Sequence, residues 1–139
     1  SNVNGIYRFD SGAWTVITNT MQASSMVQYN DFIYFLSIPN ATNSLGRWSP
    51  GGGFAAVAPA NLHTMMGGTR GGGNLVIFKE RLFIVPGIDK NDTTSRLIFS
   101  DAGLPETYTA TTQFIDIHPG DGQKLVDLLS HDDNLMLFK

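Results

Sequence analysis

The hydrophobic positions of this chain fall into short clusters, and one arrangement of them occurs three times. Each copy has a strand-like apolar run, a tight polar turn and a second run that is apolar at consecutive positions. The copies are Met26–Phe35, Leu75–Ile84 and Leu125–Phe138. They recur after about 50 residues, a period typical of repeat architectures. The pattern therefore predicts a repeated antiparallel hairpin.

Shorter pairs of β-prone runs flank these three hairpins. They cover 5–17, 45–58 and 96–117, and the first two have Gly-containing turns. In chain order we expect the end of one unit (1–17), two complete units (24–58 and 75–117) and the start of another (124–139). Four antiparallel strands joined as a meander are the blade of a β-propeller. The predicted fold class is all-β: a single partial β-propeller of two full blades and two partial ones over 1–139.

The second strand of each unit supports this interpretation. A strand covered on both faces is apolar at consecutive positions, whereas a half-exposed strand alternates. In a propeller, neighbouring blades cover both faces of the inner strands. The third and fourth strands are shorter and more mixed, as strands near the rim should be. The continuous runs are Phe32–Phe35, Leu82–Val85 and Leu135–Phe138.

Two other architectures compete with the propeller. A β-sandwich also has short strands and frequent turns. A helix-containing fold is disfavoured, because the apolar pattern never holds a 3.6-residue period over ten residues. We expect 59–74 to be a linker between the full units, and 38–44 and 86–95 to be matching polar connections. Because propellers usually need four or more blades, we expect a longer polypeptide or other subunits to complete the ring.

The amino-acid composition excludes several kinds of function. The chain has 139 residues, a net charge of −3 and no cysteine. Without cysteine, disulfides, thiolate nucleophiles and cysteine-bound zinc are excluded. The charge provides no basic field for sequence-specific nucleic-acid binding. No apolar run is long enough for membrane insertion.

Candidate chemical motifs are weak. The glycine cluster 67–73 lacks the Lys-Ser/Thr ending and the following helix of a phosphate loop. His63, His118 and His131 lack zinc-ligand spacing. We interpret Ser130-His131-Asp132 as a polar turn, because the members of a hydrolytic triad converge from separate segments. We therefore predict no catalytic, cofactor-binding or metal-binding residues and no cofactor.

Several surface features give weaker signals still. The oxygen-rich loop with Asp89, Asn91 and Asp92 has fewer ligands and a looser spacing than a calcium loop, which favours a solvated loop over the alternative of a weak cation site. Sequons begin at Asn40 and Asn91 and have meaning only in a secretory context. Most aromatic residues suit core packing. Those near turns are candidates for contact with a sugar or a partner protein: Trp14, Trp48 and Tyr108.

The most distinctive stretch is the loop Ser100–Tyr108, between the third and fourth strands of its unit. It resembles the Asp-box of sialidase-type propellers, a structural turn of Ser, Asp, Gly, Thr and an aromatic residue, although its spacing differs. The wider segment 81–138 contains Phe-Ser-Asp-x-Gly-x-Pro-Glu and then Phe-Ile-Asp-x-x-Pro-Gly-Asp-Gly. This segment resembles part of the propeller-bearing tail proteins of tailed bacteriophages.

The resemblance implies a structural component of the virion tail, such as a nozzle or minor tail subunit, arranged as a ring. Its partners would be other tail subunits in a homo-oligomeric ring, and it would have no enzymatic activity. The resemblance implies turn-forming roles for two groups of residues: Ser100, Asp101, Gly103 and Pro105, and Pro119, Gly120, Asp121 and Gly122.

Two alternative functions remain. A carbohydrate-binding or carbohydrate-active propeller of a cell-surface protein would need acids and arginines clustered at the ring centre, but the arginines are scattered along the chain. A cytoplasmic protein-interaction propeller would be expected to carry Trp-Asp endings or double-Gly signatures, which the predicted units lack. The scattered arginines that count against the carbohydrate alternative are Arg8, Arg47, Arg70, Arg81 and Arg96.

Overall fold

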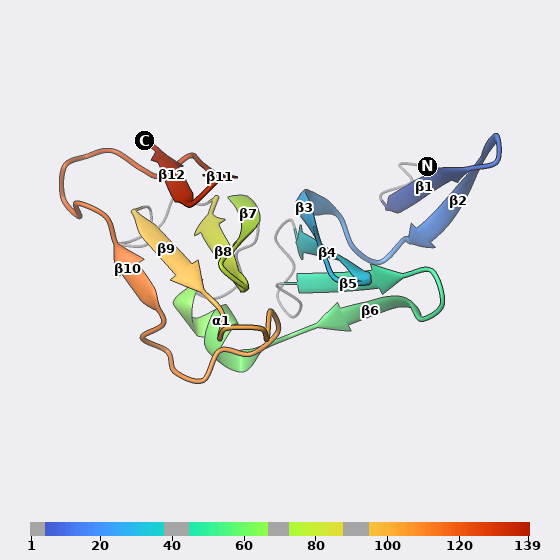
Figure 1. The fold of residues 1–139 in the computed structure, drawn as a ribbon, viewed down its shortest axis with the longest axis horizontal. Coiled ribbons are helices and arrows are strands. Elements are labelled where there is room, and N and C mark those ends of the chain that lie inside the picture. Colours follow the sequence, from blue (N-terminus) through green and yellow to red (C-terminus); the bar gives the residue numbers. More distant parts are fainter. Residues whose placement is uncertain (1–4, 38–44, 67–72, 88–94) are drawn as a thin grey trace.

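The chain folds into antiparallel β-sheets that lie one after another along its long axis (Figure 1). The computed structural model describes residues 5–37, 45–66, 73–87 and 95–139. In these ranges there are twelve strands and one short helix. The predicted β class is confirmed. The described sheets form an open row, with no closed ring among them.

Two four-stranded sheets occupy the middle of the row, and each is a meander of neighbouring strands. The first contains β3 (Ala23–Tyr29), β4 (Phe32–Ser37), β5 (Leu45–Ser49) and β6 (Gly53–Val57). The second contains β7 (Gly73–Phe78), β8 (Arg81–Pro86), β9 (Arg96–Phe99) and β10 (Phe114–Asp116). These sheets match the predicted units 24–58 and 75–117. Their third and fourth strands are the shorter ones, as expected.

A two-stranded hairpin lies at each end of the row (Figure 1). The first pairs β1 (Ile6–Asp10) with β2 (Ala13–Thr18), and the last pairs β11 (Asp127–His131) with β12 (Asn134–Phe138). They occupy the segments predicted as the end of one unit and the start of another.

The repeated hairpins share one turn geometry. In each, two loop residues join the strands: Tyr29 opposes Phe32, Phe78 opposes Arg81, and His131 opposes Asn134. The first loop residue has a positive φ every time: 52° at Asn30, 44° at Lys79 and 50° at Asp132. Positive φ is what a two-residue hairpin loop needs to match the twist of its strands. The threefold repetition in the sequence is therefore present in the backbone.

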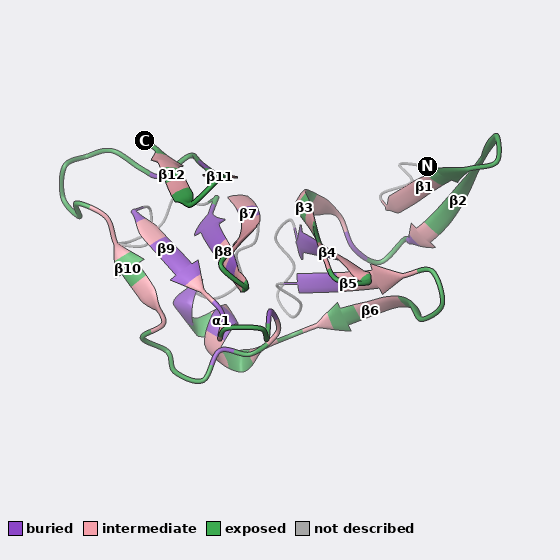
Figure 2. Ribbon diagram, in the orientation of Figure 1, coloured by how far each residue is buried: buried purple, intermediate pink, exposed green. Residues whose placement is uncertain are grey.

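The central sheet β7–β10 is covered on both faces, and alternate residues of β8 enter different cores. Leu82 and Ile84 pack with Leu36 and Leu45 of the neighbouring four-stranded sheet. Val85 lies on the opposite face and packs with Leu128 of the last hairpin, and partly buried Phe83 joins that cluster. Because successive strand residues point to opposite faces, a strand between two sheets needs apolar residues throughout. Figure 2 shows the resulting burial in β4, β5, β8 and β9.

Strand β12 does not follow that prediction. Its residues alternate between exposed and half-buried, so only one face is covered in the described structure. Leu135 and Leu137 contact the core beside the central sheet. Met136 and Phe138 are 37% and 45% exposed. The expectation of two covered faces was wrong here because a described sheet packs against one side only.

The predicted linker 59–74 contains a helix, α1 (Ala60–Met65). The helix has only six residues, so a search for a 3.6-residue period over ten residues does not detect it. Leu62, Met65 and Met66 are almost completely buried in the core between the two four-stranded sheets. The connection therefore fills the space between the sheets at their lower edge (Figure 1). No described helix is long and apolar enough to cross a membrane.

Candidate functional site

The loop between β9 and β10 is the best-defined polar feature of the described structure. It starts at Ser100, which is completely buried. The Leu82 amide donates to the Ser100 hydroxyl at 2.9 Å, and the Ser100 amide donates to the Leu82 carbonyl at 3.0 Å. Arg81 also donates to the Ser100 carbonyl at 2.7 Å. These bonds attach the loop to β8, and they satisfy a buried polar group that would otherwise be destabilising.

Asp101 holds the loop in its turn. Its carboxylate accepts from the Gln113 side chain at 2.6 Å and from the Thr109 hydroxyl. Its amide donates to the Thr107 carbonyl at 2.9 Å. Gly103 has φ +72°, a conformation that favours glycine. These contacts agree with the turn-forming role that the resemblance implied for Ser100, Asp101 and Gly103, and Pro105 is buried beside them.

Glu106 carries the loop's contact with the neighbouring sheet. Its Oε1 accepts from Arg47 Nη1 of β5 at 2.6 Å and from the Tyr34 hydroxyl of β4 at 3.0 Å. Burial, with the Glu106 carboxylate as the next cause, raises the pKa of Tyr34 to about 12. Hydrogen bonding to Glu106 also raises the pKa of Arg47. The loop therefore joins the two four-stranded sheets through a charge-assisted contact.

Tyr108 lies at the inner end of the same loop and is only 5% exposed. Its hydroxyl has no hydrogen-bond partner among the described residues, and burial raises its pKa. Its carbonyl accepts from the Asn61 side chain of α1 at 2.6 Å. The expectation that Tyr108 is available to a sugar or partner was wrong, because the side chain packs in the core with Leu62 and Met65.

The other two aromatic candidates differ from each other. Trp14 of β2 is 72% exposed. The Trp48 ring of β5 is covered by the Arg8 guanidinium, 5.4 Å from its centroid. Of the three candidates, Trp14 alone presents a large open aromatic surface.

The second predicted turn, around Pro119 and Gly120, has a local structural role. Gly120 and Gly122 have φ +88° and +76°. Asp121 accepts from Lys139 Nζ at 2.6 Å, and this bond is the largest cause that lowers the pKa of Asp121. The turn therefore contacts the residue that follows β12.

The histidines do not form a metal site. Among the described residues, no three histidine or acidic side chains lie close enough to hold an ion. His131 is 3.6 Å from Asp132, and both are exposed at the β11–β12 turn. The candidate calcium loop and both sequons lie outside the described residues, as does the glycine cluster except for Gly73.

The described arginines form separate structural contacts instead of one cluster. Arg96 makes a two-pronged contact with Asp116, at 2.9 and 3.1 Å, and stacks on Phe114 at 3.5 Å. Arg8 lies 3.7 Å from Asp10. Arg70 lies outside the described residues. The Arg96 pair joins β9 to β10, whereas Arg8 and Asp10 lie on the same strand and are exposed.

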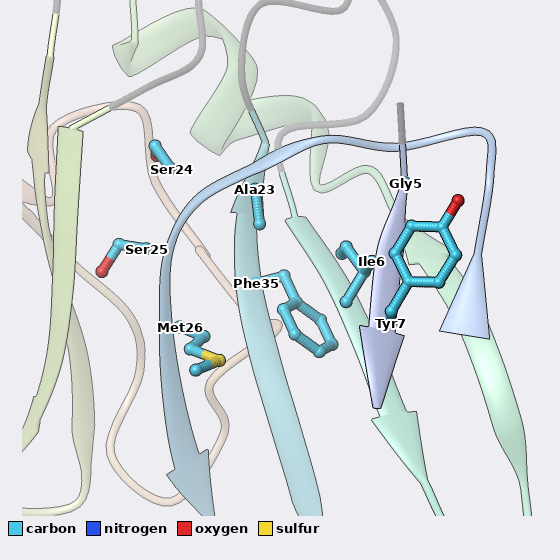
Figure 3. Close-up of a pocket in the computed structure, with 8 residues that line it drawn as sticks. All are labelled: Gly5, Ile6, Tyr7, Ala23, Ser24, Ser25, Met26 and Phe35. Carbon is cyan, nitrogen blue, oxygen red and sulfur yellow. The ribbon is translucent and has the colours of Figure 1, made fainter. Parts of the chain in front are cut away.

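An open hollow of about 340 Å³ lies between β1 and β3 (Figure 3). Ile6 and Tyr7 line one side, and Met26 and Phe35 line the other. Its lining has no acidic or basic side chain. Its polar groups are Tyr7, Ser24 and Ser25, and both serine hydroxyls bond to backbone, Ser24 to the Leu36 carbonyl and Ser25 to the Leu75 amide.

Sequence reasoning missed the role of Glu106. The sequence predicts a turn there, and nothing in Pro105-Glu106-Thr107 distinguishes an inter-sheet ion pair from a solvated glutamate. Its partners lie 59 and 72 residues earlier in the chain. A scan of models of known protein families gives no match to this sequence, and a search of curated proteins also gives none.

Proposed function

We propose that this chain is a non-enzymatic structural subunit of a bacteriophage tail or tail-like particle, built from blades of a β-propeller. The order of contacts between sheets supports the propeller. The first strands of successive sheets contact one another, β3 with β7 and β7 with β11. The last strands of the first two sheets also meet, β2 with β6. Sheets fanned around an axis place equivalent strands side by side in this way.

The structural role is supported mainly by the contacts of the loop Ser100–Tyr108. Ser100, Asp101 and Glu106 are engaged in holding the turn and joining two sheets. An enzyme or sugar-binding site would need such groups turned toward an open cavity. The virion assignment rests on the resemblance of 81–138 to tail proteins. In this proposal the protein resides in the virion tail, and its partners are other tail subunits in a ring.

The test is the presence of the protein in assembled particles. Particles purified from the source of this sequence are analysed by mass spectrometry and labelled with an antibody to the chain. We expect labelling at the tail and a fixed number of copies per particle. Absence from purified particles would overturn the proposal.

A glycan array and a screen of glycosidase substrates provide the complementary measurement. We expect signals no higher than those of a Trp14→Ser variant, which removes the exposed indole. Specific binding or hydrolysis that is lost in this variant would favour the carbohydrate alternative.

A further inference from the structure

The two four-stranded sheets have corresponding faces, and their hairpin turns define which residues correspond. Phe32 follows the turn of the first sheet as Arg81 follows the turn of the central sheet. Two residues further along, and therefore on the same face of the strand, Tyr34 corresponds to Phe83. We call this face the trailing face, because in each sheet it points toward the sheet that follows in the chain.

The core residues establish the direction of the trailing face. In the first sheet, Leu36 lies two residues after Tyr34 and packs in the core shared with the central sheet. In the central sheet, Val85 lies two residues after Phe83 and packs with Leu128 of the last hairpin. The trailing face of the first sheet therefore meets the central sheet, and that of the central sheet meets the last hairpin.

Each trailing face carries a guanidinium stacked on an aromatic ring across its second and third strands. In the first sheet, the guanidinium of Arg47 on β5 lies 5.1 Å from the centroid of the Phe32 ring on β4. In the central sheet, the guanidinium of Arg81 on β8 lies 5.7 Å from the centroid of the Phe99 ring on β9. The cation and the ring exchange strands between the two sheets, but the kind of contact is the same.

The two guanidinium groups differ in whether a carboxylate reaches them. Glu106, on the β9–β10 loop of the following sheet, accepts from Arg47 at 2.6 Å and from the Tyr34 hydroxyl at 3.0 Å. Arg81 donates one N–H group to the Ser100 carbonyl at 2.7 Å. A guanidinium has five such donors, and no carboxylate of the described residues lies within ion-pair distance of Arg81.

The two trailing faces also differ in how far they are covered. Tyr34 is only 3% exposed, whereas Phe83 at the corresponding position is half-buried. At corresponding positions of the fourth strands, Val57 packs against the core between the sheets, whereas Ile115 is 51% exposed. Within the described residues, the last hairpin therefore contacts the central sheet along β7 and leaves the trailing face open toward β10.

Aromatic rings and cations share this part of the central sheet. The Phe83 centroid lies 6.1 Å from that of Phe78 and 6.0 Å from that of Phe99, so the three rings form one apolar surface. Lys79 Nζ lies 5.1 Å from the Phe78 centroid and provides a second cation near Arg81. A carboxylate placed against such a surface would make charge-assisted hydrogen bonds partly shielded from water.

We propose that the trailing face of the central sheet, around Arg81, Phe83 and Phe99, binds a Pro-Glu turn carried by another four-stranded sheet. The argument for this occupant is internal: at the corresponding place on the first sheet, the chain itself supplies the turn Pro105-Glu106. The glutamate of the bound turn would accept from the N–H groups of Arg81 that Ser100 leaves free. The inference rests on the proposed propeller packing of sheets, and it does not require the tail assignment.

The probe is a cyclic peptide of residues 99–113, which contains the whole turn. Its ends are neighbours in the fold, because the Phe99 amide donates to the Gln113 carbonyl at 3.0 Å. Cyclisation therefore keeps the turn closed and lowers the entropy lost on binding. Fluorescence anisotropy measures the affinity of the labelled peptide for the full chain. We expect saturable binding that weakens as salt is added, since the contact joins opposite charges.

Two comparisons test the predicted contact. The same peptide with Glu106→Gln should bind about tenfold more weakly, and this comparison requires no change in the chain. In the chain, Arg81→Met should cause a loss of about the same size. Arg47→Met is the matched control, because Arg47 already pairs with Glu106 of its own chain; it should leave the affinity within about twofold. Circular dichroism checks that each variant remains folded.

Three results would overturn the proposal. The first is equal affinity for the two peptides, or no saturable binding below about 1 mM. The second is binding that is lost in Arg47→Met and kept in Arg81→Met, since the peptide would then be displacing the chain's own loop. The third is self-association that Arg81→Met abolishes, without peptide binding, which would assign the face to a second copy. None of these results changes whether the protein is found in purified tails, so the two proposals fail separately.

Discussion

The two central sheets and the two terminal hairpins are built from similar strands but differ in burial. In β8 both faces are covered: Leu82 and Ile84 on one face are completely buried, and Val85 on the other is 1% exposed. In β12, which has the same position in its unit and an equally apolar sequence, Met136 and Phe138 are more than one-third exposed. The difference follows from the number of neighbouring sheets: within the described residues, sheets lie on both sides of β8 and on one side of β12.

This comparison shows that a repeat unit carries only part of its own stabilisation. Apolar burial contributes in proportion to the area removed from water, and much of that area belongs to a contact between units. In repeat proteins, stability is divided in this way between units and interfaces. The terminal hairpins should therefore be the least stable elements of an isolated chain.

The largest effect is expected for a leucine in the central core. Leu82→Ala should reduce the free energy of unfolding by about 3 kcal/mol, because removing a fully buried leucine loses transfer energy and leaves a cavity. The matched change Leu129→Ala, at a residue 50% exposed, should cost less than about 1 kcal/mol. Urea denaturation in dilute solution measures both. Equal losses would contradict the comparison.

The next largest effect concerns the contact of Glu106 with Arg47. Glu106→Gln should lower the free energy of unfolding by about 1 kcal/mol, since the contact is charge-assisted but partly open to solvent. A double-mutant cycle with Arg47→Met isolates the coupling. The more exposed pair of Arg8 and Asp10 in the first hairpin provides the comparison and should show weaker coupling. Stronger coupling in that hairpin would reverse the predicted order.

The free energy of unfolding should also depend on alkaline pH, because Tyr34 lies in the first four-stranded sheet. The pKa of Tyr34 is raised to about 12 in the folded protein, so folding favours the neutral phenol. Its contribution is fully present below the unfolded pKa near 10 and is lost as pH rises toward 12. Tyr34→Phe should therefore reduce the loss of stability between pH 9 and about 11.5, by roughly 1–2 kcal/mol. Urea denaturation at both pH values is the measurement, and an unchanged difference would contradict it.

The smallest effect is expected near the last hairpin. Lys139 lowers the pKa of Asp121, so their contact stabilises the fold above the unfolded pKa and is lost as pH falls through the folded pKa. Lys139→Met should therefore lower the melting temperature slightly at pH 7 and leave it unchanged at pH 3, so that the difference between the two pH values becomes smaller. Thermal unfolding at pH 7 and pH 3 checks this. A large loss at neutral pH would mean that the turn supports more of the fold than its exposure suggests.

The sequence was a good guide wherever a feature repeats. Apolar runs separated by tight polar turns predicted the hairpins of β3–β4, β7–β8 and β11–β12, and the flanking turns predicted the remaining pairs. It failed at features that depend on distant partners. The helix α1 has too few residues for a periodic signal. It is held in place because Leu62 and Met65 are buried against residues of both four-stranded sheets.

The loop between β9 and β10 shows the same division. Its turn residues, Ser100, Asp101 and Gly103, were found from their types and order. The burial of Tyr108 and the pairing of Glu106 were not, because the groups that surround them come from β4, β5 and α1. No local pattern encodes a contact between residues so far apart in sequence.

The sequence by itself determined the strands, their hairpin turns and the two four-stranded meanders, because alternation and turn chemistry act between near neighbours in the chain. Only the tertiary structure decided which faces are covered, where the connecting helix packs and which acid joins the sheets. Those outcomes depend on what lies across an interface, and the same apolar strand is buried in the middle of the row and half open at its end.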